Sequence, residues 1–126
     1  MSKIHSRNNR DTELALVKIF HTDKVSGWRR NQPVFGKPDF VFSASRTAVF
    51  VDGCFWHSCP KCKLIPRQNG SFWKKKLSAN KLRDKTVNRI LGQRGWKIIR
   101  IWECDVKRRK VMEEKIKAIK VVNRQT

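Results

Sequence analysis

The sequence predicts an α/β domain in which a small mixed sheet is flanked by helices. Two short apolar runs, residues 40–42 and 47–51, flank a polar turn, which is typical of a β-hairpin. A third apolar run, residues 96–102, follows a glycine and predicts a strand that neighbours the hairpin. Helical patterns surround these runs, and 126 residues suffice for one packed core but not for two. We therefore expect a single domain over residues 1–126.

The N-terminal quarter is predicted to be a basic arm followed by a helix. Residues 1–10 are polar and show no apolar period, so they are expected to form the arm. Asp11 or Thr12 is a suitable N-cap for a helix that runs to about Thr22. Glu13 then lies in the first turn, where a carboxylate interacts favourably with the helix dipole. By itself, this position gives Glu13 a structural role only.

The later elements follow from breakers, caps and periodicity. Residues 28–34 predict an irregular edge strand, weakened by Pro33. Ser71 is a suitable N-cap for a long basic helix that runs to about Arg94. Residues 107–126 alternate basic and apolar residues at helical spacing, which predicts a C-terminal helix that covers one face of the sheet.

The charge of the chain indicates a polyanionic partner. Its 30 basic and 10 acidic side chains give a formal net charge of +20, and such self-repulsion destabilises a compact state unless a polyanion relieves it. Nucleic acid is the expected partner, and an anionic membrane surface is the weaker alternative. The cations expected to contact DNA are Lys3, Arg7, Arg10, Lys74, Lys75 and Lys76. We see no apolar run of membrane-spanning length and no signal peptide, so we expect a cytoplasmic protein.

The four cysteines favour a metal site, because disulfides are rare in cytosolic proteins. Cys59 and Cys62 have the C-x2-C spacing that lets two thiolates bind one tetrahedral zinc ion, and Cys54 and Cys104 complete the set. Four buried thiols without a ligand are the alternative. A redox pair is less favoured, since no thioredoxin pattern surrounds it.

Two aspartates and a histidine suggest a hydrolytic site. Asp39 begins the first strand of the hairpin and Asp52 ends the second, so antiparallel pairing brings them to the same end. Carboxylates there can hold Mg²⁺, which often binds through one or two protein carboxylates plus phosphates. His57 could take a proton from the attacking water. The alternatives are strand-end caps for the aspartates and, for His57, a zinc ligand or a loop histidine.

Several motifs carry a resemblance to a known family. They are Gly-Lys-Pro-Asp-Phe-Val-Phe (36–42), Val-Phe-Val-Asp-Gly-Cys-Phe-Trp-His-Ser-Cys (49–59), Ser-Phe-Trp-Lys-Lys-Lys-Leu (71–77), Asn-Lys-Leu-Arg-Asp (80–84) and Gly-Trp-Lys-Ile-Ile-Arg-Ile-Trp-Glu-Cys (95–104). In order and spacing these resemble the very short patch repair (Vsr) endonucleases, and the match runs from residue 1 to about 109. The resemblance implies a restriction-endonuclease-like fold of the PD-(D/E)XK type with a structural zinc site. It implies a Mg²⁺-dependent nick 5′ of the thymine at a T:G mismatch, in repair of deaminated 5-methylcytosine.

The resemblance also implies roles for individual residues at the active site. Asp39 matches the metal-binding aspartate, and Val51 falls where the family uses a main-chain carbonyl as a second Mg²⁺ ligand. His57 matches the histidine that activates water. Glu13 matches a glutamate near the active site, which adds a catalytic role to its structural one.

Zinc ligands and base-stacking residues are implied in the same way. Zinc-binding cysteines of the family match Cys54, Cys62 and Cys104, and Cys59 makes an all-cysteine site the simple interpretation. Aromatic residues that wedge beside the mismatch match Phe55, Trp56 and Trp73. Wedges of this kind offset the unstacking cost, which is lower at a mismatch. The alternative is that Phe55 and Trp56 belong to the core beneath the zinc loop.

One departure from the family concerns Asp52. Many relatives have a histidine there that is thought to assist the leaving group, which an aspartate cannot do as a cation. Asp52 is therefore either a metal ligand or a residue with another role in the site.

Two other functions fit the same residues. One is a site-specific, homing-type endonuclease of the same fold that acts on matched DNA. The other is a non-catalytic zinc module that binds DNA, although binding alone requires neither Asp39 nor His57. The resemblance implies a bacterial or phage-type protein of the nucleoid that works beside mismatch-repair proteins, and we expect a monomer.

Overall fold

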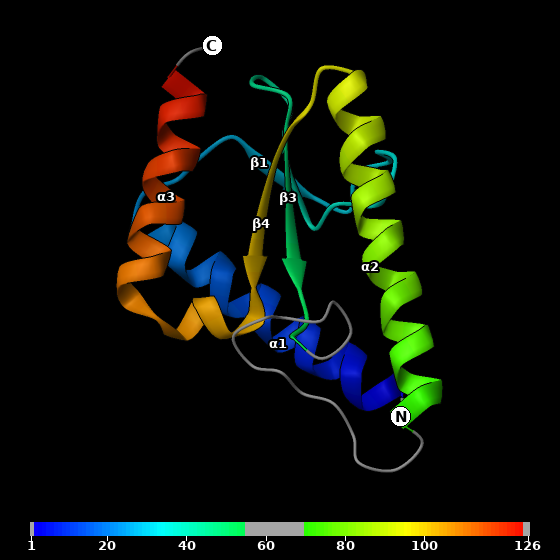
Figure 1. Ribbon diagram of the computed structural model, residues 1–126. Coiled ribbons are helices and arrows are strands. Elements are labelled where there is room, and N and C mark those ends of the chain that lie inside the picture. The colour runs from blue at the N-terminus through cyan, green and yellow to red at the C-terminus, as the bar shows by residue number, and fades with distance from the viewer. Residues whose placement is uncertain (1, 55–69, 125–126) are drawn as a thin grey trace.

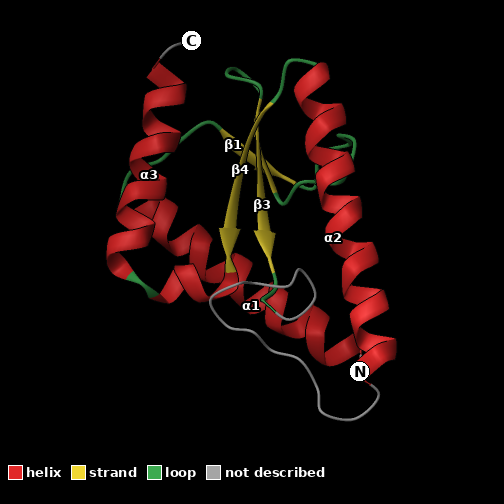
Figure 2. Ribbon diagram, in the orientation of Figure 1, coloured by secondary structure: helices red, strands yellow, loops and turns green. Residues whose placement is uncertain are grey.

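The computed structural model describes the backbone of residues 2–54 and 70–124 and the side chains of residues 11–54 and 70–122. In chain order the described elements are α1 (Ser2–Thr22), β1 (Trp28–Arg30), β2 (Phe40–Phe42), β3 (Thr47–Asp52), α2 (Gly70–Gln93), β4 (Lys97–Trp102), the 3₁₀ helix η1 (Glu103–Lys107) and α3 (Arg109–Arg124). Figures 1 and 2 show a central sheet with helices on both sides. The predicted α/β class with a sheet flanked by helices is confirmed.

The four strands form one mixed sheet in the order β1-β2-β3-β4. The pairs β1–β2 and β2–β3 are antiparallel, which confirms the hairpin, whereas β3 and β4 are parallel. Parallel neighbours need a long crossover, and α2 lies on it between β3 and β4. The carboxyl ends of β3 and β4 therefore point the same way, toward the side where α1 crosses beneath them (Figure 1).

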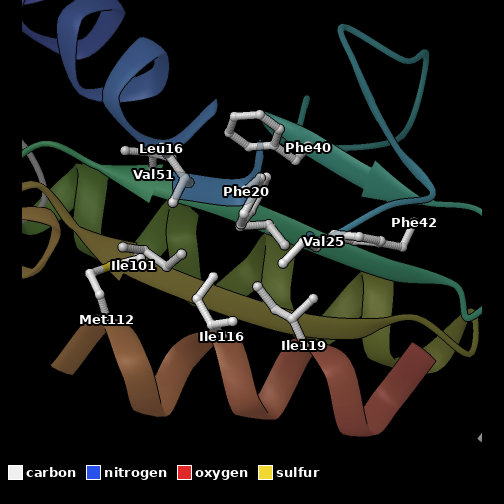
Figure 3. Close-up of a cluster of buried hydrophobic side chains, with 11 residues drawn as sticks. Leu16, Phe20, Val25, Phe40, Phe42, Val51, Ile101, Met112, Ile116 and Ile119 are labelled. Carbon is white, nitrogen blue, oxygen red and sulfur yellow. The ribbon is translucent and has the colours of Figure 1, made fainter. Parts of the chain in front are cut away.

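Two layers of helices cover the two faces of the sheet. The larger core lies between the sheet and the helices α1 and α3, and Figure 3 shows Phe20 of α1 and Ile116 of α3 pointing toward the strands. The smaller core packs Leu91 of α2 against Ala48 and Phe50 of β3. Because every residue of β3 is buried, successive side chains of this strand enter opposite cores.

The main correction to the sequence prediction concerns the N-terminus. Residues 2–10 belong to helix α1, so the separate basic arm is wrong. The physical reason is visible in the sequence, which has no glycine or proline between Ser2 and Thr22 to stop the helix. Asp11 and Thr12, which the sequence suggested as caps, lie inside the helix.

The edge strand is also shorter than predicted. β1 ends at Arg30, because Asn31 takes a left-handed conformation with φ of 54° that no strand continues through. Its position at the edge of the sheet is as predicted. No helix in the described part of the chain is both long and apolar enough to cross a membrane.

Candidate active site

A pocket of about 280 Å³ lies at the carboxyl end of β3, between the sheet and α2. Its lining residues include Lys37, Asp39, Val51, Asp52, Asp84 and Arg100. Strand alternation explains part of this composition, since Asp52 continues the row of Ala48 and Phe50, which faces α2. As the sequence predicted, the two aspartates of the hairpin lie at one end of the sheet and share this pocket.

Asp39 is held at the start of β2 by bonds to the neighbouring strand. Its backbone N–H donates to the Val49 carbonyl (3.0 Å), and its Oδ2 accepts a short hydrogen bond from the Val51 N–H (2.6 Å). The pKa of Asp39 is raised from 3.8 to about 8, and burial is the largest cause. A hydrogen bond with Glu13 and the negative charges of Glu13 and Asp52 contribute to the same rise, whereas the hydrogen bond from the Val51 N–H opposes it.

Glu13 reaches this cluster from helix α1, and the catalytic role that the resemblance implied for it stays a prediction. Its Oε2 lies 3.6 Å from Nη2 of Arg30 on the edge strand, so it connects three elements of the fold. Arg30 in turn lies over the ring of Phe40, with its Cζ 5.9 Å from the ring centroid. Its Nε is buried without a hydrogen-bond partner among the described residues. Residues that the sequence separates widely thus meet around one carboxyl group.

Asp52 forms an ion pair that the sequence analysis did not predict. It is 3% exposed, and Nη1 of Arg100 donates to both of its oxygens at 2.9 and 3.1 Å. Arg100 also donates from Nε to Asn88 Oδ1 (2.9 Å) and lies over the ring of Phe50, with its Cζ 4.3 Å from the centroid. The sequence feature that could have revealed this pair is Arg100, a charged residue in the middle of the apolar run at β4.

Two of the four cysteines meet at the ends of β3 and β4. The Cys104 N–H donates to Sγ of Cys54 (3.3 Å), although 50 residues separate them in the chain. The Cys54 N–H donates to Oε1 of Glu103 (3.3 Å), and neither thiol forms a disulfide. N–H groups that point at a sulfur favour its thiolate form, which is the form that binds zinc.

The first turns of α2 carry aromatic rings and lysines together. Phe72 is 59% exposed, and its ring centroid lies 5.3 Å from that of Trp73. Nζ of Lys76 lies 5.8 Å from the Trp73 ring centroid, and Lys74 and Lys75 are exposed beside it. Flat rings next to cations are the arrangement that binds stacked bases and phosphates.

Comparison with known proteins identifies the family. A family model described as DNA mismatch endonuclease Vsr matches residues 1–64. Over 119 residues the chain is 38% identical to the type II nicking enzyme V.NmeAIP of Neisseria meningitidis, an alignment that covers 92% of this chain and 83% of that enzyme. The chain belongs to the Vsr family.

Two further relatives match shorter parts of the chain. It is 51% identical over 67 residues to the type II nicking enzyme V.NaeI of Lentzea aerocolonigenes, which is 53% of this chain and 40% of that enzyme. It is 35% identical over 81 residues to the DNA mismatch endonuclease Vsr of Escherichia coli, which is 63% of this chain and 51% of that protein. The α/β architecture with its four-stranded mixed sheet fits a Vsr-like nuclease.

Several predicted site residues fall outside the described residues. They are His57, Phe55, Trp56, Cys59 and Cys62. The side chains of Lys3, Arg7 and Arg10 are likewise outside the described part, although their backbone lies in α1. The roles of these eight residues stay predictions.

The pocket suits a divalent cation that is held mainly by oxygen. Within the described residues, no group of three or more acids, histidines or cysteines is arranged to enclose a metal ion. Mg²⁺ needs no such enclosure, since it keeps several waters and binds through one or two carboxylates plus phosphates. Asp39 fits this requirement, because its raised pKa shows a buried carboxyl among negative neighbours that a cation can neutralise in place of a proton.

Proposed function

We propose that this member of the Vsr family is a Mg²⁺-dependent endonuclease that nicks one DNA strand 5′ of the thymine at a T:G mismatch. The observation that carries the proposal is the cluster of Asp39 with Glu13 and Asp52, of which Asp39 and Asp52 line one pocket. This concentration of negative charge in a chain of net charge +20 needs a functional reason. A metal ion held by Asp39 would neutralise this charge and would polarise a DNA phosphate.

The chain's own residues have distinct tasks in this mechanism. Asp39 and the main-chain carbonyl of Val51 are the proposed Mg²⁺ ligands, and the bound ion would polarise the scissile phosphate and lower the pKa of a water ligand. The hydrogen bond between Asp39 and Glu13 orients the Asp39 carboxylate in the pocket. His57 is the proposed base that takes the proton from the attacking water.

Zinc is the proposed structural metal. Cys54 and Cys104 are already adjacent through a hydrogen bond between backbone and sulfur, and Cys59 and Cys62 would complete a tetrahedral site. Such a site ties the segment after β3 to the segment after β4. It thereby anchors the chain on both sides of His57, which lies between Cys54 and Cys59 in the sequence.

DNA would lie across the pocket and the first turns of α2. The exposed lysines at 74–76 supply phosphate contacts, and Trp73 supplies a ring for stacking beside the mismatch. Phe55 and Trp56 are the proposed wedge residues. Because base pairing is already weakened at T:G, insertion of rings there costs less than in matched DNA.

The decisive experiment compares duplexes that differ in one base. Labelled T:G and T:A duplexes with varied flanking sequence are incubated with the protein and Mg²⁺, and with EDTA as the control. We expect a single-strand cut at T:G that requires Mg²⁺ and does not occur at T:A. Equal cutting of both duplexes would instead favour a site-specific endonuclease that acts on matched DNA; the relatives V.NmeAIP and V.NaeI are named type II nicking enzymes. Binding without cutting under any metal would leave a zinc-stabilised DNA-binding module.

A further inference from the structure

Arg100 stands out because it places a charge in the middle of an apolar strand. Its neighbours in β4 are Ile99 and Ile101, which pack in or against the larger core on the opposite face. Arg100 therefore faces α2, where its side chain is 19% exposed and lines the same pocket as Asp39. A charge in this position carries a desolvation cost that an apolar residue would avoid.

The guanidinium is fixed on three sides by described residues. Asp52 accepts from Nη1, Asn88 accepts from Nε, and the ring of Phe50 supports one face. Its Nη2 contacts the Asp84 carbonyl only at 3.5 Å. Nη1 also lies 3.9 Å from Oδ1 of Asp84. A guanidinium has five N–H donors in a rigid fork, so these contacts leave donor capacity on a residue that lines the pocket.

A fixed guanidinium beside a metal-binding carboxylate has the chemistry of a phosphate site. Arg binds phosphate through paired N–H donors, and a preorganised donor costs no rearrangement during reaction. In hydrolysis the water oxygen bonds to phosphorus, one P–O ester bond breaks, the water proton passes to the base, and the departing oxygen takes a proton from solvent. Negative charge grows meanwhile on the phosphoryl oxygens, where cationic donors stabilise it.

We propose that Arg100 contacts the scissile phosphate in this pocket, and that Asp52 is a positioning residue that holds Arg100 there. This inference rests on the proposed function, since it assigns a residue to the same site. It also explains why an acid is present at position 52, where many relatives have a histidine. Arg100 supplies the cation, and Asp52 orients Arg100 instead of acting on the substrate.

The first test uses DNA binding without divalent metal, so that it does not depend on cutting. The dissociation constant of a labelled T:G duplex is measured against salt concentration for wild type and Arg100→Gln. Loss of one phosphate contact should lower the slope of log K against log salt by about 0.9. The matched control is Arg109→Gln on α3, which removes the same charge from a side chain that is 93% exposed and outside the pocket. We expect the control to keep the wild-type slope.

The second test separates positioning from binding. Arg100→Gln should lower kcat about 100-fold, as loss of one preorganised donor does, and Arg100→Lys should recover part of the loss. Asp52→Asn should lower kcat while it keeps the wild-type salt slope, because the cation remains but loses its anchor. If Asp52 only stabilised the fold, Asp52→Asn would change kcat and the salt slope together, and the folded fraction would fall with them. Circular dichroism measures that folded fraction.

Each outcome decides the proposal. If Arg100→Gln leaves the Asp52 charge buried and unfolds the protein, the double variant Asp52→Asn/Arg100→Gln removes both charges and should show the same loss of slope. A wild-type slope in the folded variant, or an equal loss in Arg109→Gln, would overturn the phosphate contact. Wild-type kcat in Asp52→Asn would overturn the positioning role. If the wild-type protein cuts no duplex, the proposed function fails, and the salt slopes still decide whether Arg100 binds phosphate.

Discussion

Replacing Asp39 by asparagine should stabilise the metal-free protein at neutral and alkaline pH. Burial and the neighbouring Glu13 and Asp52 raise the pKa of Asp39 to about 8, so the folded state keeps this carboxyl protonated up to that pH. Asparagine has the shape of the protonated acid. Its amide oxygen can accept from the Val51 N–H, and its amide nitrogen can donate to Glu13.

The magnitude follows from linkage between proton binding and folding. Between pH 4 and pH 8 the folded state holds a proton on Asp39 that the unfolded state has released, so stability is full below pH 4 and falls as the pH rises to 8. Each pH unit in this window costs about 1.4 kcal/mol. From pH 5 to pH 8 the wild type should therefore lose roughly 4 kcal/mol that Asp39→Asn retains.

The assay is urea unfolding of both proteins at pH 5 and pH 8 in buffer without added divalent metal or chelator. Taking the difference between the two proteins cancels the titrations of groups that do not interact with Asp39. Asp11→Asn, at an exposed position on α1, controls for the loss of one negative charge. Added Mg²⁺ should stabilise only the wild type at pH 8, and Asp39→Asn should not nick DNA. A stability difference that is the same at pH 5 and pH 8 would refute the reasoning, since Asp39 would then carry no extra proton.

Three further predictions address the metal site, the loop before Asp39 and the core. Cys104→Ser should lower the zinc content, about one ion per chain in the wild type, measured by atomic absorption; full metal content would remove Cys104 from the ligand set. Gly36→Ala should cost about 1–3 kcal/mol in urea unfolding, because φ is +80° and the new Cβ would lie 2.5 Å from Cγ1 of Val87. The control Gly92→Ala has open space in α2 and should be neutral or stabilising; equal effects would contradict this account. Phe20→Ala should cost about 3–5 kcal/mol, because Phe20 is fully buried at the centre of the larger core; a cost below 1 kcal/mol would show that this core can repack.

Short-range patterns were sufficient to predict most of the sheet. The predicted runs 40–42 and 47–51 lie in strands β2 and β3, and the polar turn between them pairs them as a hairpin. The same pairing places Asp39 and Asp52 at one end, which follows from chain direction alone. The resemblance added Glu13, which the sequence placed in the first turn of a helix and which lies inside α1, in contact with Asp39.

Long-range contacts account for what could not be predicted. The pair of Asp52 and Arg100 depends on the parallel register of β3 and β4, and sequence does not specify which strand lies beside β3. Asn88 joins them only because α2 packs on that face. The prediction of β1 was too long for a local reason. Asn31 adopts φ of 54°, which asparagine tolerates and which ends the strand, whereas most residues at this position would continue it.

The pocket contains two aspartates, Asp39 and Asp52, whose charges are neutralised in different ways. At Asp39 the acidic neighbours leave a negative site that only a proton or a cation can neutralise, and this is the condition for binding a metal. At Asp52 the acid is already neutralised by Arg100, which makes it a poor metal ligand and a rigid support. In the proposed mechanism, the DNA phosphate interacts with both a metal ion and a hydrogen-bond donor. The two aspartates of one hairpin therefore serve different purposes in that mechanism: Asp39 holds the metal ion, and Asp52 holds Arg100.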